Sequence, residues 1–229
     1  FSARSAARWR AFAQESALTG LFLKEGRHMD TLWGETEGKM TFHAHADGQA
    51  HPLHLTPGGF FQANRDVNRL LTGALRELAP TYRGGAVLDL YCGAGNFTLP
   101  LSLDAGRVLG VEGNPVAAAD ARHNAAAIGA DHVEVRSGPV GRLLGSLDDR
   151  WRGPALCLLD PPRTGAAEAI APILHLKPER IAYVSCAPAT LTRDLQALVD
   201  SGYRIEHARM ADMFPQTGHA EALVVLSRS

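Results

Sequence analysis

The stretch AVLDLYCGAGNF, residues 86–97, decides the fold class of this chain. A short apolar run is followed directly by Gly93 and Gly95, as in a buried strand that ends in a tight turn before a helix. Glycines at that place let the backbone approach a ligand closely, and the start of the next helix favours polar or anionic groups. The stretch therefore predicts a strand–turn–helix unit of an α/β domain that binds a small molecule.

Strand-like and helical segments alternate after this stretch. The expected strands are residues 86–92, 107–113, 132–138, 154–160 and 180–186, and the expected helices are residues 114–130, 139–149, 166–176 and 188–202. Such alternation is typical of a parallel sheet with helices on both faces. Residues 203–214 and 221–229 are two strand-like runs joined by a loop, which predicts an antiparallel pair at the end of the chain.

The part of the chain before this domain has a different character. Residues 64–78 predict a helix with Asn64 as its N-cap. Earlier residues predict one helix and several short strands with glycine-bearing turns, so we expect two units, residues 1–55 and residues 56–229. The chain does not begin with methionine and starts within a helical pattern, so we expect it to be a piece of a longer protein.

Composition limits the classes of protein and the partners. The 229 residues, 45% of them hydrophobic, suffice for one α/β domain and a smaller appendage. The sequence lacks the roughly 18-residue apolar run of a membrane span, so we expect no membrane partner. The three cysteines, Cys92, Cys157 and Cys186, cannot all pair and form no Cys-x-x-Cys motif. We therefore expect no disulfide framework, no metal site and a reducing, cytoplasmic location.

A carboxylate follows the glycine turn at the sequence separation expected for a nucleoside-binding site. Glu112 ends the next predicted strand, where it can accept hydrogen bonds from both ribose hydroxyls. A dinucleotide fingerprint would require a third glycine where this chain has Thr98. Asp89, before the turn, can hold a cationic or amine-bearing ligand. These features favour S-adenosylmethionine over NAD.

Three more residues lie at predicted strand ends. Asp160 ends a strand and is followed by two prolines, which make the segment stiff. Cys186 ends the next strand, although a cysteine in that position, taken alone, is more often a core residue. Glu221 enters an apolar final strand, where a carboxylate needs a partner or a function. A desolvated glutamate makes a plausible general base, and His219 is the rival for that role.

A thiol, a carboxylate base and a methyl donor together match methylation of a pyrimidine at carbon 5. A thiolate adds to C6 and makes C5 nucleophilic, C5 accepts the methyl group, and the base then removes the C5 proton. Two alternatives remain open. One is an amino-group nucleic-acid methyltransferase that uses the Asp160-Pro161-Pro162 shelf and needs no thiol, and the other is an RNA-binding module without turnover.

Six ordered motifs resemble those of the RNA 5-methyluridine methyltransferases. They are FFQAN (60–64), LDLYCGAGNFTLP (88–100), GVEGNP (110–115), LLDPPRTG (158–165), YVSCAPATLTRDL (183–195) and DMFPQTGHAE (212–221). The resemblance implies a seven-stranded class I methyltransferase sheet, Rossmann-like, with an antiparallel terminal strand. It also implies that Cys186 is the nucleophile and Glu221 the base, and that residues 1–55 are the end of a central RNA-binding domain.

The resemblance further implies the ligands and their contacts. The S-adenosylmethionine contacts that it implies are Gln62, Tyr91, Asn96, Glu112 and Asp160. To these we add Asp89, Gly93 and Gly95 from the glycine turn, and we expect the substrate contacts at Phe61, Pro161, Arg163 and His219. The partner would be RNA, and VSCAPATLTRDL is more similar to the ribosomal-RNA branch than to the transfer-RNA branch. No obligate protein partner is evident. Ala187 departs from the asparagine or aspartate that usually follows the nucleophile.

Overall fold

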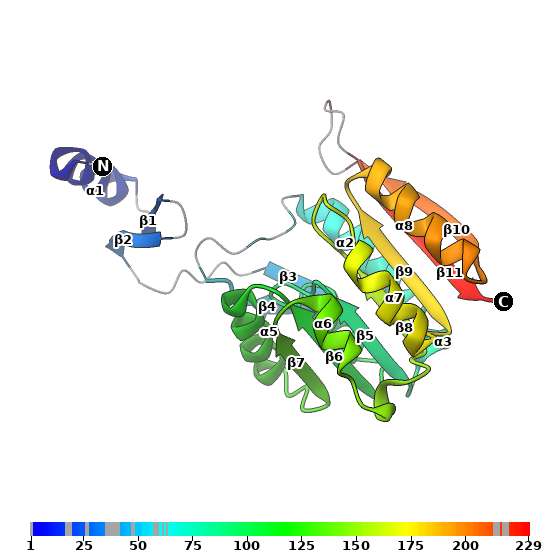
Figure 1. Ribbon diagram of the computed structural model, residues 1–229. Helices are drawn as coiled ribbons and strands as arrows, with labels where there is room; N and C mark the ends of the chain where they lie inside the picture. Colours follow the sequence, from blue (N-terminus) through cyan, green and yellow to red (C-terminus); the bar gives the residue numbers. More distant parts are fainter. Residues whose placement is uncertain are drawn as a thin grey trace.

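The computed structural model describes residues 2–16, 20–25, 28–34, 42–46, 49–56, 60, 62, 64–212, 216 and 220–229. Its centre is a seven-stranded sheet with the strand order β10-β11-β9-β8-β5-β6-β7, which Figure 1 shows. The strands are β5 (Ala86–Leu90), β6 (Arg107–Glu112), β7 (Val133–Ser137), β8 (Leu156–Leu159), β9 (Arg180–Ser185), β10 (Tyr203–Ala211) and β11 (Glu221–Arg228).

The expected class I methyltransferase topology is confirmed. The five strands β5 to β9 are parallel, and β11 pairs antiparallel with both β9 and β10. All five residues of β5 are buried, as befits a central strand with helices on both faces. A parallel crossover needs a connection of about a dozen or more residues, whereas only nine residues (212–220) separate β10 from β11, so the two strands run antiparallel.

Helices cover both faces of this sheet (Figure 1). On one face, which we call the α2 face, lie α2 (Arg65–Arg76), α3 (Ala79–Tyr82), α4 (Thr98–Ser102) and α5 (Pro115–Ala127). The opposite face is covered by α6 (Val140–Gly145), α7 (Ala167–Leu176) and α8 (Pro188–Asp200). No helix within the described ranges is long and apolar enough to cross a membrane.

The segment of residues 139–151 differs from the sequence prediction. The expected helix over residues 139–149 ends at Gly145, and a separate 3-10 turn, η1 (Asp149–Trp151), follows it. Asp148 caps this turn through the backbone N–H of Arg150, and Trp151 is buried in the core. The buried tryptophan and the Asp148 cap therefore favour a separate turn here, although the sequence pattern predicts one continuous helix.

The upstream residues form α1 (Ala3–Glu15) and two hairpins, β1–β2 (Gly20–Glu25, His28–Gly34) and β3–β4 (Phe42–Ala46, Gln49–Leu53). Leu53, at the end of the second hairpin, is buried against Leu99 and residues of α5. Just after it, Asp120 of α5 accepts hydrogen bonds from the backbone N–H and hydroxyl of Thr56. These contacts attach the second hairpin to the sheet domain, and the boundary near residue 55 stays a prediction.

Candidate functional site

The predicted site residues gather at one edge and on one face of the sheet. Side chains alternate between the faces along a strand, so residues two apart share a face. Val87, Leu158, Val184 and Leu223 all pack on the α2 face. Asp89, Asp160, Cys186 and Glu221 each stand two residues from one of these and continue on that face, at the carboxyl edge of the parallel strands. Ligands bind at this edge in open α/β sheets.

The turn after β5 has the backbone of a ligand cradle. Gly93 and Gly95 have φ angles of +55° and +93°, a left-handed conformation that favours glycine. Tyr91 also has a positive φ, 63°, which costs a side-chain-bearing residue about 1–3 kcal/mol. The backbone N–H of Tyr91 donates to the carbonyl of Val111 at 2.8 Å and so fixes the start of the turn. Such a strained residue beside a glycine turn suggests a functional constraint.

Glu112 closes this cradle from the end of β6. Its two carboxylate oxygens accept from the backbone N–H of Gly93 at 2.9 Å and from that of Asn114 at 2.7 Å. Asn114 in turn caps α5 through the N–H groups of Val116 and Ala117. A carboxylate oxygen can accept a second hydrogen bond, so Glu112 can still bind ribose hydroxyls while it holds the turn.

Asp89 is a fully buried carboxylate with an unused acceptor. The hydroxyl of Thr98 donates to its Oδ2 at 2.5 Å. Its Oδ1 has no hydrogen-bond partner among the described residues. Burial raises the pKa of Asp89 to about 7. The hydrogen bond from Thr98 lowers this pKa, and the negative charge of Glu112 raises it further. An orphan buried carboxylate oxygen is costly, so this site fits a ligand with an amine or a cation.

Asp160 lies between Asp89 and Glu221. Burial, followed by the negative charges of Glu221 and Asp89, raises the pKa of Asp160 to about 8. Gln62, itself buried, opposes this shift by donating from Nε2 to Asp160 Oδ2 at 3.2 Å. The structure thus brings three of the predicted carboxylates together in a poorly solvated place. Such a cluster favours a positively charged ligand.

Cys186 and Glu221 stand at adjoining ends of the neighbouring strands β9 and β11. Ala222 pairs with Ser185 in the β9–β11 ladder, Glu221 directly precedes Ala222, and Cys186 directly follows Ser185. The thiol of Cys186 is free and partly exposed, whereas Glu221 is buried. Burial raises the pKa of Glu221, and the nearby positive charge of Arg163 lowers it. A free thiol and a strengthened base therefore occupy the same corner of the sheet.

The remaining predicted residues have varied positions. Pro161 is buried behind Asp160, and Arg163 is exposed. The amide of Asn96 exchanges two hydrogen bonds with that of Asn68 on α2, at 2.8 and 2.9 Å. Two residues predicted to contact the substrate, Phe61 and His219, lie outside the described residues.

Sequence reasoning missed two partners of the site. In the sequence Thr98 stands out only because it replaces a third glycine, yet its hydroxyl donates to Asp89. Asn68 is buried in the middle of α2, and a buried asparagine in an amphipathic helix is a sign of a hydrogen-bonded partner.

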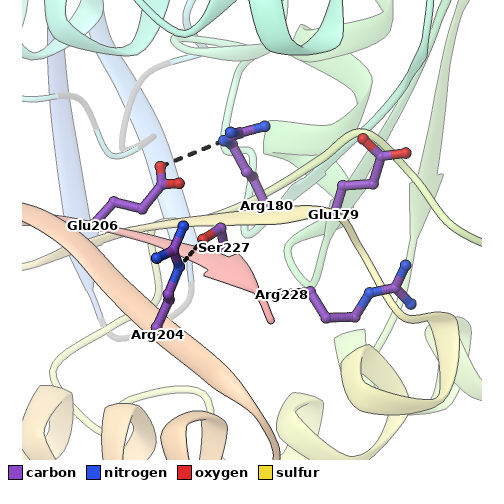
Figure 2. Close-up of a pocket in the computed structure, with 6 residues that line it drawn as sticks. All are labelled: Glu179, Arg180, Arg204, Glu206, Ser227 and Arg228. Atoms are coloured by element: carbon purple, nitrogen blue, oxygen red, sulfur yellow. Dashed lines mark hydrogen bonds and ion pairs between the residues drawn. The ribbon is translucent and has the colours of Figure 1, made fainter.

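A separate cavity of about 320 Å³ opens at the opposite ends of β9 and β11, as Figure 2 shows. Its lining residues are Glu179, Arg180, Arg204, Glu206, Ser227 and Arg228. Arg180 Nε lies 3.4 Å from Glu206 Oε2, and Arg204 Nε donates to Ser227 Oγ at 3.3 Å. Because this cavity lies at the other ends of the strands from Cys186, we do not include it in the site.

Comparison with known families agrees with this geometry. The family model described as tRNA (Uracil-5-)-methyltransferase matches residues 45–137 and 146–229. The chain belongs to this family. The matched residues include the glycine turn, the Asp-Pro-Pro segment, Cys186 and Glu221.

Its relatives include ribosomal-RNA enzymes. The chain is 37% identical over 211 residues to the 23S rRNA (uracil(1939)-C(5))-methyltransferase RlmD of Aeromonas hydrophila, covering 86% of this chain and 48% of that protein. It is 42% identical to the RlmD of Alkalilimnicola ehrlichii over 184 residues, covering 79% of this chain and 41% of the relative. The chain thus spans about half the length of the curated relatives it matches.

A solved structure in the same family has a similar fold. The Pyrococcus abyssi tRNA (uracil-54, C5)-methyltransferase, in complex with S-adenosyl-L-homocysteine, superposes with a TM-score of 0.70 at 28% identity. The match covers 91% of this chain and 50% of that one.

Proposed function

We propose that this chain methylates uridine at carbon 5 in RNA, with S-adenosylmethionine as the methyl donor, as an RNA (uracil-5-)-methyltransferase. The observation that supports this most is that Cys186 and Glu221 stand at adjoining strand ends, together with the carboxylates Asp89 and Asp160. An amino-group methyltransferase has no need of a thiol near a buried base. Family membership supports the same reaction.

The cradle fits S-adenosylmethionine. Asp89 Oδ1 offers an unused buried acceptor to the amino group, and Glu112 offers acceptors to the ribose hydroxyls. The ionised forms of Asp89 and Asp160 favour the positive charge of the sulfonium. When bound there, the cofactor would supply an electrophilic methyl group.

The residues of the chain would carry out the other steps on uracil. The deprotonated thiol of Cys186 would form a bond to C6, and the C5=C6 electron pair would move to C5, which takes the methyl group as the methyl–sulfur bond of the donor breaks and leaves its electron pair on sulfur. The carboxylate of Glu221 then takes the C5 proton. The C–H electron pair re-forms the C5=C6 bond, and the Cys186 sulfur leaves as thiolate. Glu221 suits this role because burial raises its pKa and makes it a stronger base.

We propose ribosomal RNA as the substrate and the cytoplasm as the place of action, since relatives with 34–42% identity are 23S rRNA methyltransferases. We further propose that residues 56–229 perform the chemistry and that residues 1–55 contribute to RNA binding. The helix α1 contains Arg4, Arg8 and Arg10, and cations of this kind contact phosphates.

The decisive experiment measures transfer of a labelled methyl group from S-adenosylmethionine to RNA. We expect incorporation into unmodified 23S rRNA as 5-methyluridine, and much less into transfer RNA. Label found on an exocyclic amino group, or no incorporation into any uridine-containing RNA, would contradict the proposal.

Glu112→Ala is expected to weaken S-adenosylmethionine binding. A hydrogen bond to a charged group contributes about 1.5–3 kcal/mol, so the Kd should rise by about 10- to 150-fold. Calorimetry on the variant measures this. Glu134→Ala removes a carboxylate from the adjacent strand β7 outside the cradle and should leave the Kd unchanged. An unchanged Kd for Glu112→Ala would mean that the ribose is bound elsewhere.

The affinity for S-adenosylmethionine should increase with pH between about 6 and 7.5. The raised pKa values, about 7 for Asp89 and about 8 for Asp160, keep both carboxyls largely neutral in acid, and they ionise as the pH rises. Only the ionised forms attract the sulfonium. The Kd should therefore fall with pH, by at most about tenfold per pH unit for each proton released. Above about pH 8 the amino group of the ligand itself loses its charge.

Asp89→Asn provides the matched control, because it removes one titrating group and should flatten the profile. In the ligand-free protein, the same carboxyls should make the free energy of unfolding decrease as the pH rises. Groups with raised pKa values stabilise the fold more in acid, so their contribution to the free energy of unfolding declines from about pH 4 to about pH 8. A pH-independent Kd for the unmodified protein would contradict the assigned charges.

A further inference from the structure

The loop between β8 and α7 is held by side chains from another helix. This loop contains Asp160 and Arg163 and ends where α7 begins, at Ala167. In the first turns of α8, the hydroxyl of Thr190 donates to the carbonyl of Arg163 in the loop and to that of Ala187 at the start of its own helix, both at 3.1 Å. Arg193 donates from Nη2 to the carbonyl of Thr164, also at 3.1 Å. Two consecutive carbonyls of the loop are thus bound by α8.

A buried carboxylate completes these contacts. Asp194 is 1% exposed, and its Oδ2 accepts from the backbone N–H of Ala166 and from the hydroxyl of Tyr183, both at 2.7 Å. Its Oδ1 accepts from Arg193 Nε at 2.8 Å. Burial raises the pKa of Tyr183, so its hydroxyl stays protonated and remains a donor. Tyr183 belongs to β9, three residues before Cys186, so Asp194 joins this strand, α8 and the loop.

The loop approaches α8 too closely for any residue except glycine at position 165. A Cβ on Gly165 would lie 2.5 Å from Arg193 Nη2, 2.7 Å from Asp194 Oδ2 and 2.9 Å from Thr190 Cβ. Its φ of +77° also favours glycine. Gly165 therefore permits the three α8 side chains to reach the loop backbone.

We propose that Thr190, Arg193 and Asp194, which we call the α8 clamp, are positioning residues for the methylation reaction. They tie the loop that contains Asp160 and Arg163 to the strand–helix unit that contains Cys186. The clamp would hold the charge of Arg163 near Glu221 and would hold the Asp160 segment in a fixed position relative to the Cys186 thiol. These groups would then keep a fixed arrangement when uracil binds. This inference rests on the proposed function and assigns to these residues no contact with the substrate.

Thr190→Val tests the clamp with a nearly isosteric change. We expect the single-turnover rate of covalent adduct formation with 5-fluorouridine RNA to fall about three- to tenfold. The Kd for S-adenosylmethionine and the thermal unfolding midpoint should match those of Thr192→Val. Thr192 lies on the same helix, but its hydroxyl donates to Pro188 of that helix and not to the loop. Thr190→Ser keeps the hydroxyl and should restore the rate.

Amide hydrogen exchange provides a readout that does not depend on activity. In Asp194→Asn and Thr190→Val, the amides of residues 163–166 should exchange about tenfold faster than in Thr192→Val, while the amides of the central strands keep their protection. Equal adduct rates and equal exchange for Thr190→Val and Thr192→Val would overturn the clamp. If the unmodified protein forms no adduct with any uridine-containing RNA, the proposed function fails, and with it the clamp's role in the reaction. The exchange data then report only whether α8 holds the loop.

Discussion

Replacing Cys186 with alanine is expected to abolish methylation of uridine while S-adenosylmethionine still binds. The thiol acts on C6 of uracil and lies outside the turn formed by Gly93, Gly95 and Glu112. Loss of a nucleophile that forms a covalent intermediate lowers the rate by on the order of 10⁴-fold or more. Transfer of labelled methyl groups measures the rate, and calorimetry with S-adenosylmethionine measures the binding.

The chain offers a control for this experiment. Cys157 is fully buried in β8, so Cys157→Ala removes a thiol from the core and should lower stability slightly while activity remains. Protein with Cys186 intact should form a denaturation-resistant adduct with 5-fluorouridine RNA, because fluorine at C5 cannot be removed as a proton is. Robust methylation by Cys186→Ala would exclude this residue as the nucleophile.

The sheet could be predicted from the sequence because its strands are short apolar runs bounded by glycine and proline. The carboxyl-edge positions of Asp89, Asp160 and Cys186 follow from the same pattern. The neighbouring positions of Cys186 and Glu221 could not be predicted from periodicity, because they depend on the register between β9 and β11. That register is set by long-range packing, and a shift of one residue would move Glu221 to the other face.

Contacts between distant side chains also escaped prediction. The hydrogen bond from Thr98 to Asp89 depends on α4, a helix of five residues that is too short to show helical periodicity. The role of Asp194 depends on the path of a loop about 30 residues earlier in the chain. Its sequence context, TLTRDLQAL, indicates only an amphipathic helix. The burial of Asp194 is what distinguishes it from an ordinary surface aspartate, and this burial can be seen only in the packed structure.

Glu221→Gln is expected to separate the two halves of the reaction. Glutamine preserves the size of the side chain at the start of β11 but cannot accept a proton, while addition of the Cys186 thiolate and methyl transfer do not require the base. The C5 proton would then stay in place, and the methylated uracil would remain bonded to Cys186. Loss of a general base slows a step by about 10²–10⁴-fold, so the adduct should accumulate and survive denaturation.

Gel electrophoresis of labelled RNA after denaturation detects this adduct, and mass spectrometry shows whether it contains the transferred methyl group. Glu206→Gln makes the same chemical change on the adjacent strand β10, at the end of the sheet away from Cys186, and should release product at the normal rate. An adduct without the methyl group would place the function of Glu221 before methyl transfer. Product release at the normal rate by Glu221→Gln would assign the proton abstraction to His219 or to water. The raised pKa of Glu221 would then be a consequence of burial alone.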